Sequence, residues 1–211
     1  MPGPRVKPAT TTRAKRASTK PTAPRAASSN RAATKTATST PRTHAAFLRG
    51  VMPTNCKMSE LAAALSRGPF TNVATVLGSG NVVFTTALTD RAAIERALSE
   101  AMQRHLGRVF VPYVRSLAEL EALVAADPFA PFALSPSAKR VVTFLPAAPA
   151  RTSPPSARHG AQILAVRGTE ALTAYERSEH GPVFMELLTE TFGDAATTRT
   201  WDTLLKVLGK R

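Results

Sequence analysis

The sequence predicts an α+β protein that consists of two tandem ferredoxin-like halves behind a disordered basic N-terminal tail. Three observations favour this fold. Apolar residues alternate in short runs or recur with a helical period in the order β-α-β-β-α-β over residues 44–115, which is the order of the split βαβ unit. A related order returns over residues 140–208, whereas residues 1–43 show neither pattern. We therefore expect a tail of residues 1–43, a first half of residues 44–127 and a second half of residues 128–211.

The predicted tail differs from the rest of the chain in charge and composition. It contains ten of the 28 Lys and Arg residues, none of the 14 Asp and Glu residues, and no Leu, Ile, Phe, Tyr or Trp. Such a segment cannot bury enough apolar surface to offset the entropy that ordering would cost. Its charge can attract nucleic acid or another polyanion without sequence preference. A solubilising tail, a transit-type peptide and a misassigned start codon are the competing interpretations.

Residues 44–115 carry the clearer of the two patterns. The fold is expected to begin at His44. We expect a strand over residues 45–48, a helix with an apolar face at Met58, Leu61, Ala62 and Leu65, a hairpin of residues 72–77 and 81–86, a helix between Asp90 and Gly107, and a strand over residues 109–114. The turn of the hairpin is Gly78-Ser79-Gly80. Because Pro112 has no N–H to donate to a ladder, we expect the last of these strands at a sheet edge.

The second half follows a helix that the capping box Ser116–Glu119 opens and that stops at Asp127-Pro128. The pattern then predicts a strand over residues 140–145, a hairpin of residues 161–166 and 170–175, a helix from Pro182 to Gly193, an extended segment over residues 197–199, and a final helix capped by Thr200. Residues 146–160 contain four prolines. A Pro-rich loop therefore takes the place of the first helix of this half.

Three strings of the chain are typical of one family: Phe47-Leu48-Arg49-Gly50, Ser79-Gly80-Asn81-Val82-Val83-Phe84 and Thr197-Thr198-Arg199-Thr200-Trp201-Asp202-Thr203. On these strings the chain resembles the bacterial domain-of-unknown-function family 1697, over about residues 45–208. The resemblance implies two tandem α/β plaits and no established activity. At residues 51–55 the chain has Val-Met-Pro-Thr-Asn where the family usually has Ile-Asn-Val-Gly-Gly, so the chain resembles a divergent subgroup.

A candidate ligand site consists of Arg49, Ser79, Asn81, Arg199 and Asp202. Two arginines beside a polar turn can hold a carboxylate or a phosphate through paired hydrogen bonds. In the same turn, the side chains of Ser79 and Asn81 can offer further polar contacts. The ligand that these residues predict is therefore a small anion.

The same residues also have a structural interpretation. Residues 78–81 join two strands and lack the lysine and the following helix of a phosphate-binding loop, so they can simply form a turn. Asp202 can cap a helix or form a salt bridge. We expect Trp201, the only tryptophan, in the core rather than on a binding surface.

Other chemistry-bearing residues give no motif. A single cysteine, Cys56, excludes an intrachain disulfide and a thiolate zinc cage, and it has no neighbouring histidine to activate it. The four histidines, His44, His105, His159 and His180, have no metal-ligand spacing. We therefore predict no metal and no cofactor. No apolar run approaches the about 20 residues that span a membrane, so we expect no membrane association and a cytoplasmic location.

Two hypotheses of function follow. In the first, the protein is a ligand- or partner-binding module whose residues 1–43 associate with nucleic acid or another polyanion. In the second, it is an enzyme that acts on a small anionic or phosphorylated substrate near Arg49 and Arg199.

Overall fold

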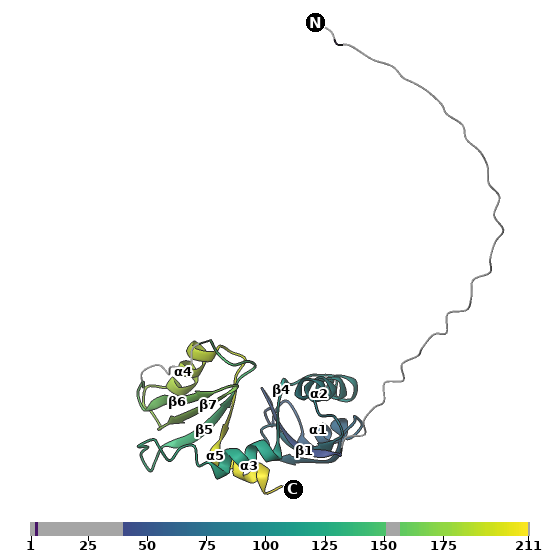
Figure 1. Cartoon of the computed structure of the whole chain (residues 1–211), viewed down its shortest axis with the longest axis horizontal. Coiled ribbons are helices and arrows are strands. Elements are labelled where there is room, and N and C mark those ends of the chain that lie inside the picture. The colour runs from purple at the N-terminus through teal and green to yellow at the C-terminus, as the bar shows by residue number, and fades with distance from the viewer. Residues whose placement is uncertain (1–2, 4–39, 151–156, 211) are drawn as a thin grey trace, which may run out of the picture. The chain divides into compact units, whose positions relative to one another are not determined.

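The computed structural model describes Gly3, residues 40–150 and residues 157–210. Apart from Gly3, these residues fall in one compact unit. Within them the chain forms five helices and eight strands, and the strands make two four-stranded antiparallel sheets (Figure 1). Most of the predicted tail lies outside the described residues.

The first sheet consists of β1 (Arg42–Leu48), β2 (Thr71–Val76), β3 (Asn81–Thr86) and β4 (Pro112–Ser116), in the order β2-β3-β1-β4. Two helices, α1 (Met58–Leu65) and α2 (Arg91–Leu106), pack on one face of it. Their apolar side chains form a core with Ala46, Leu48, Val82, Phe84 and Val114 of the strands. As predicted, the side chain of Asp90 caps α2 by accepting a hydrogen bond from Ala93 N.

The second sheet repeats this strand order with fewer helices. It consists of β5 (Lys139–Phe144), β6 (Ala161–Arg167), β7 (Glu170–Tyr175) and β8 (Thr197–Thr200), in the order β6-β7-β5-β8. One helix, α4 (Val183–Phe192), precedes β8. No helix occurs between β5 and β6 in the part of that connection that the structure describes, which agrees with a loop in place of a first helix.

Two further helices, α3 (Leu117–Ala125) and α5 (Trp201–Leu208), directly follow the edge strands β4 and β8. The last residue of each strand caps the helix, because the hydroxyls of Ser116 and Thr200 accept from backbone N–H groups in the first turn. Both helices contribute to a core shared by the remaining faces of the two sheets. Within this core, Phe47 of β1 stacks on Phe144 of β5 with ring centroids 4.4 Å apart.

Two predicted strands differ from the observed ones by more than one residue at an end, and the other strand ends lie within one residue of the prediction. β1 begins at Arg42, three residues before the predicted start at residue 45, because Arg42 and Thr43 pair with β3; the ladder extends the strand beyond its apolar run. β4 spans residues 112–116 rather than 109–114. Residues 109–111 precede the ladder with β1, which starts at the pairing of Pro112 with Leu48. Pro112 thus lies at a sheet edge, as predicted.

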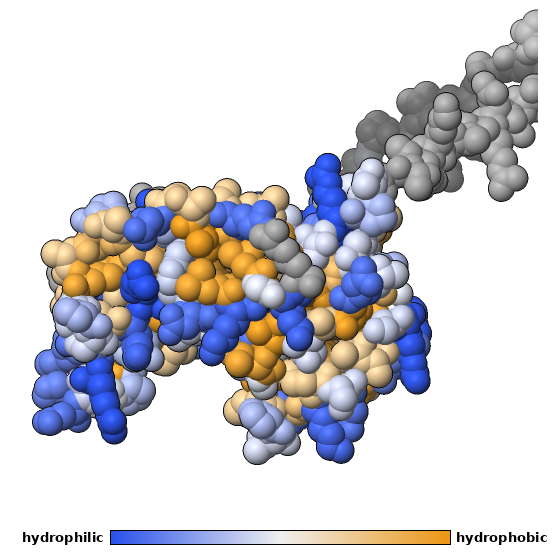
Figure 2. All heavy atoms as spheres, turned by 90° about the horizontal axis from the view of Figure 1, so that it is seen from below, coloured by the Kyte–Doolittle hydropathy of each residue, from blue (hydrophilic) through white to orange (hydrophobic). Residues whose placement is uncertain are grey.

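The surface carries no single apolar face in the view that Figure 2 gives. Hydrophobic side chains form several patches bordered by hydrophilic ones (Figure 2). None of the helices in the described part of the chain is long and apolar enough to cross a membrane. Nor do three or more His, Cys, Asp or Glu side chains of the described residues gather as they would around a metal ion.

Candidate binding pocket

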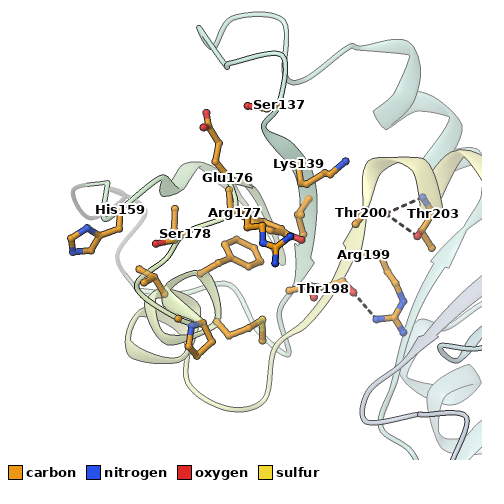
Figure 3. A pocket seen from close by; sticks show the side chains of 18 of the residues that line it. Ser137, Lys139, His159, Glu176, Arg177, Ser178, Thr198, Arg199, Thr200 and Thr203 are labelled. Atoms are coloured by element: carbon orange, nitrogen blue, oxygen red, sulfur yellow. Dashed lines mark hydrogen bonds between the residues drawn. The ribbon is translucent and has the colours of Figure 1, made fainter.

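The second sheet has a pocket on the face that α4 covers only in part. In the first sheet, α1 packs on β2 and the 16-residue α2 packs on β4. The 10-residue α4 instead packs on β6, on the side that corresponds to β2, as Figure 1 also shows. The β5 and β8 side of this face therefore stays open. A pocket of about 830 Å³ occupies it (Figure 3).

The lining of the pocket comes from both middle and edge strands of the second sheet, from the segment between β7 and β8, and from the turn of the first hairpin. Lys139 and Val141 come from β5, and Thr198 and Thr200 come from β8. The residues from Tyr175 to Met185 that line it lie at the end of β7, in the following loop and in the first turn of α4. Ser79 is the contribution of the first hairpin.

Two cations of this lining are free to meet a ligand. Within the described residues, the side chains of Lys139 and Arg177 have no hydrogen-bond or ion-pair partner. The only acidic residue of the lining is Glu176, and Figure 3 shows its side chain leaving the backbone in a different direction from that of Arg177. Cationic groups without a counter-ion favour a negatively charged ligand.

The lining also offers apolar and hydroxyl groups. The rings of Tyr175 and Phe184 stack with centroids 4.5 Å apart and form one wall. The exposed side chain of Met185 lies beside them in the lining. Six hydroxyl-bearing serines and threonines complete the lining: Ser79, Ser137, Ser178, Thr198, Thr200 and Thr203. An apolar wall with a few polar groups is the usual construction of a small-molecule site.

Helix α4 begins at the pocket without a side-chain cap. Pro182 occupies the cap position and offers no side-chain acceptor, so the first N–H groups of α4 have no side-chain partner there. The partial positive charge of a helix N-terminus acts in the same direction as Lys139 and Arg177. The prediction placed Pro182 within the first turn, whereas the helix starts one residue later, at Val183.

Arg199 also lines the pocket, but its guanidinium is fully engaged by the protein. All five N–H donors have acceptors. Nε donates to Asn81 Oδ1, Nη1 donates to Thr197 Oγ1 (3.0 Å) and Thr198 O (2.6 Å), and Nη2 donates to Leu48 O (2.8 Å) and Ser79 O (3.0 Å). Burial lowers the pKa of Arg199 to about 10, so the group is still charged at neutral pH. Arg199 thus fastens β8 to the first hairpin and has no donor left for a ligand.

The first hairpin turn is itself tightly packed. Gly80 has a φ of +73°, and a Cβ at this position would lie 2.7 Å from Cβ of Val51. Any other residue would therefore be strained and would collide with the loop after β1. Asn81 is completely buried, and its Nδ2 donates to Val76 O at 2.9 Å. These contacts agree with the structural interpretation of the turn.

Comparison with known proteins places the chain in a family. The model of a family described as "Protein of unknown function (DUF1697)" matches residues 42–170. The chain belongs to this family. A solved structure with the same kind of fold is that of a conserved bacterial protein from Streptococcus pneumoniae, which is 17% identical, with a TM-score of 0.59 over 81% of this chain and 99% of that one. At this identity the likeness concerns the fold alone. No curated protein matches the chain.

The structure brings together three of the five site residues predicted for this DUF1697 protein. Asn81 and Arg199 are hydrogen-bonded, and the carbonyl of Ser79 accepts from the same guanidinium. Arg49 lies near the start of β8, where its Nε donates to the carbonyl of Ala196 at 3.1 Å, and it does not line the pocket. Asp202 lies in the first turn of α5 and lines a different hollow, beside Trp201.

Sequence reasoning missed Lys139 and Arg177. Lys139 follows a Pro- and Ser-containing connector, and Arg177 lies in a loop without periodicity. No short motif joins them, since the pairing of β5 with β7 brings them to one pocket. Both residues lie apart from the strings that carry the family resemblance, and Arg177, Arg199 and Asp202 lie beyond the matched residues. The sequence feature that could have indicated the pocket was the absent helix of the second half, since its absence leaves part of a sheet face uncovered.

No catalytic group is evident among the described residues of the pocket. The lone thiol, Cys56, lies elsewhere, in the core of the first sheet. Burial raises the pKa of the Cys56 thiol, which opposes formation of the reactive thiolate. His159 is the one histidine of the lining, and its ring lies against that of His180, with 4.2 Å between the ring centroids.

Proposed function

We propose that this protein binds a small organic anion in the pocket on the open face of the second sheet. The observation that carries this proposal is the pair of cations without partners, Lys139 and Arg177, beside the stacked rings of Tyr175 and Phe184. Cations hold the charged part of a ligand and rings hold its apolar part. The proposed ligand therefore has both an apolar ring or chain and a carboxylate, sulfonate or phosphate group.

The enzyme hypothesis has less support. It relied on Arg49 and Arg199 as a clamp for an anionic or phosphorylated substrate. Every N–H of the Arg199 guanidinium already has a protein acceptor, and Arg49 donates to a backbone carbonyl. A binding module is thus the better proposal.

The proposed fold of each half is the ferredoxin-like plait, with residues 44–127 as the first half and residues 128–211 as the second. The strand orders β2-β3-β1-β4 and β6-β7-β5-β8 support it, because each places the first and third strands of the half side by side in the centre. In the second half, the missing helix is what leaves the pocket open.

Two dyes of nearly the same shape test the proposed binding. Anilinonaphthalene sulfonate carries an anionic group, and phenylnaphthylamine lacks it. We expect the wild-type protein to bind the sulfonate more tightly. Lys139→Ala and Arg177→Ala should each weaken sulfonate binding by about tenfold, since a hydrogen bond to a charged group contributes about 1.5–3 kcal/mol, and should leave phenylnaphthylamine binding unchanged. Fluorescence titration at constant salt measures both.

The control for this test is Lys206→Ala, which removes an exposed cation of α5 outside the pocket. It should change neither affinity. Circular dichroism of each variant must first match that of the wild type, because the sulfonate dye also binds loosely packed states. Equal sulfonate binding by wild type, Lys139→Ala and Arg177→Ala would rule the pocket out as the anion site.

A second proposal concerns the basic N-terminal residues, and its support is compositional: residues 1–43 carry ten cations and no carboxylates. We infer that they associate with nucleic acid through phosphate contacts in a cytoplasmic protein. The deletion that tests this should remove residues 1–39 only, since Arg42 and Thr43 belong to β1. Duplex DNA binding should fall steeply with salt in the full chain and be lost after the deletion. Binding that survives the deletion would contradict the inference.

A further inference from the structure

Two buried arginines occupy equivalent places in the two sheets. Arg115 is the next-to-last residue of the edge strand β4, and Arg199 is the next-to-last residue of the edge strand β8. Each precedes the residue that caps the following helix, Ser116 or Thr200. Each guanidinium also donates to the carbonyl of the residue before it. The two sheets therefore present the same arginine in the same local setting.

Both guanidinium groups reach the hairpin of the other sheet. Arg115 donates from Nε to Glu170 Oε1 at 2.5 Å and from Nη2 to Thr169 Oγ1 at 2.9 Å. Arg199 donates from Nε to Asn81 Oδ1. Glu170 is the first residue of β7 and Asn81 is the first residue of β3, so the acceptors are equivalent as well.

The aromatic partners complete the equivalence. Arg115 lies over the ring of Phe144, 5.1 Å from its centroid, and Arg199 lies over the ring of Phe47 at 5.7 Å. These two rings stack on each other between the sheets. The two arginines thus enclose one aromatic pair from corresponding positions.

The equivalence fails in charge. The acceptor of Arg115 is a carboxylate, whereas the acceptor of Arg199 is a neutral amide. Arg199 is only 9% exposed, and no carboxylate among the described residues pairs with it. Asn81 is an amide that uses both of its polar atoms, because its Nδ2 donates to Val76 O and Ser79 Oγ; a carboxylate could not donate to the carbonyl of Val76. The charge of Arg199 is therefore buried without compensation.

This uncompensated charge lies next to the pocket: Arg199 is one of the lining residues, and its side chain leaves β8 away from those of Lys139 and Thr198, as Figure 3 shows. Arg115, whose charge is compensated, is not part of the lining. We propose that Asn81 is a specificity-determining residue: by holding Arg199 without neutralising it, Asn81 leaves a buried positive charge that selects ligands with greater negative charge. Arg199 acts through its field, not through a direct hydrogen bond. This inference rests on the proposed binding function.

Thr197 offers a test that leaves Asn81 intact. Its Oγ1 accepts from Nη1 of Arg199 at 3.0 Å and is buried, so Thr197→Asp places a carboxylate beside the guanidinium, and Thr197→Asn is the neutral control of the same shape. Relative to Thr197→Asn, Thr197→Asp should weaken anilinonaphthalene sulfonate binding by about fivefold, as expected for neutralising one charge at close range. Phenylnaphthylamine binding should be equal in the two variants.

The outcomes separate the two proposals. Sulfonate binding by the wild type with equal affinities of Thr197→Asp and Thr197→Asn would overturn this inference alone. No sulfonate binding by the wild type would overturn the proposed function and this inference with it. Glu170→Gln is the matched control at Arg115 and should leave sulfonate binding unchanged. A higher sulfonate affinity of Glu170→Gln would mean that the net charge of the protein, and not the position of the charge, sets the affinity. If Thr197→Asp does not fold, Ser79→Asp against Ser79→Asn gives the same comparison at an exposed turn position.

Discussion

The two sheets of this protein have the same strand order but different coverings. In the first, α1 and α2 together cover one face, and the core beneath them is closed. In the second, α4 lies over β6 and leaves β5 and β8 with a pocket in place of a helix. The difference teaches that two sheets can keep the same strand pairing while the number and the positions of their helices decide whether a face is closed or bears a pocket.

The buried arginines differ in a parallel way. Arg115 meets Glu170 as an ion pair, and Arg199 meets only neutral acceptors. The compensated arginine lies away from the pocket and the uncompensated one lines it. The uncompensated charge and the pocket thus both belong to the second sheet, and the proposed function relates both to one ligand.

The largest expected effect compares the two arginines. Arg199→Met should cost about 4 kcal/mol of unfolding free energy, because it leaves the buried Asn81 Oδ1 and Leu48 carbonyl and the part-buried Ser79 carbonyl without this donor. Arg115→Met should cost about 3 kcal/mol, since Glu170 is 23% exposed and can turn towards water. Urea denaturation measures both.

If Arg199→Met lost less unfolding free energy than Arg115→Met, this prediction would be wrong. Such a result would mean that the desolvation of an uncompensated guanidinium outweighs its five hydrogen bonds. In that case the charge of Arg199 would not be a stable feature of the fold. The m-values of the two variants should match that of the wild type if unfolding stays two-state.

A smaller effect compares equivalent positions of the covered and open faces. Val114 and Thr198 immediately precede the two arginines, but Val114 is buried in the core beneath α1 and α2, whereas Thr198 lines the pocket. Val114→Phe should cost about 2 kcal/mol by overpacking. Thr198→Phe should change stability by less than about 0.5 kcal/mol, because its ring can enter open space. Equal losses of unfolding free energy in the two variants would show that this face of the second sheet is packed as closely as the helix-covered face of the first.

The strand and helix pattern could largely be predicted from the sequence, because it depends on local periodicity and on caps. Asp90, Ser116 and Thr200 cap helices as expected. Trp201 is buried as expected and packs edge-on against Phe129. The errors fell on strand ends, such as Arg42, where a partner strand rather than the chain's own apolar pattern sets the boundary.

The site was predictable only in part. The family strings led to Ser79, Asn81 and Arg199, which do lie together. The same strings could not reveal that the Arg199 guanidinium is saturated, because its acceptors are mostly backbone carbonyls that have no sequence signature. Lys139 and Arg177 could not be predicted for a different reason: the pairing of β5 with β7 places Lys139 opposite Tyr175, two residues before Arg177, and this pairing is a tertiary property.

The most direct measurement is sulfonate dye binding to Thr198→Phe. This variant fills the pocket from β8 and leaves Lys139, Arg177 and Arg199 in place. If the open face of the second sheet is the binding site, the affinity for anilinonaphthalene sulfonate falls by more than about tenfold, as steric exclusion from an apolar site requires, while the melting temperature stays that of the wild type. Sulfonate binding at wild-type affinity by a folded Thr198→Phe would contradict the account.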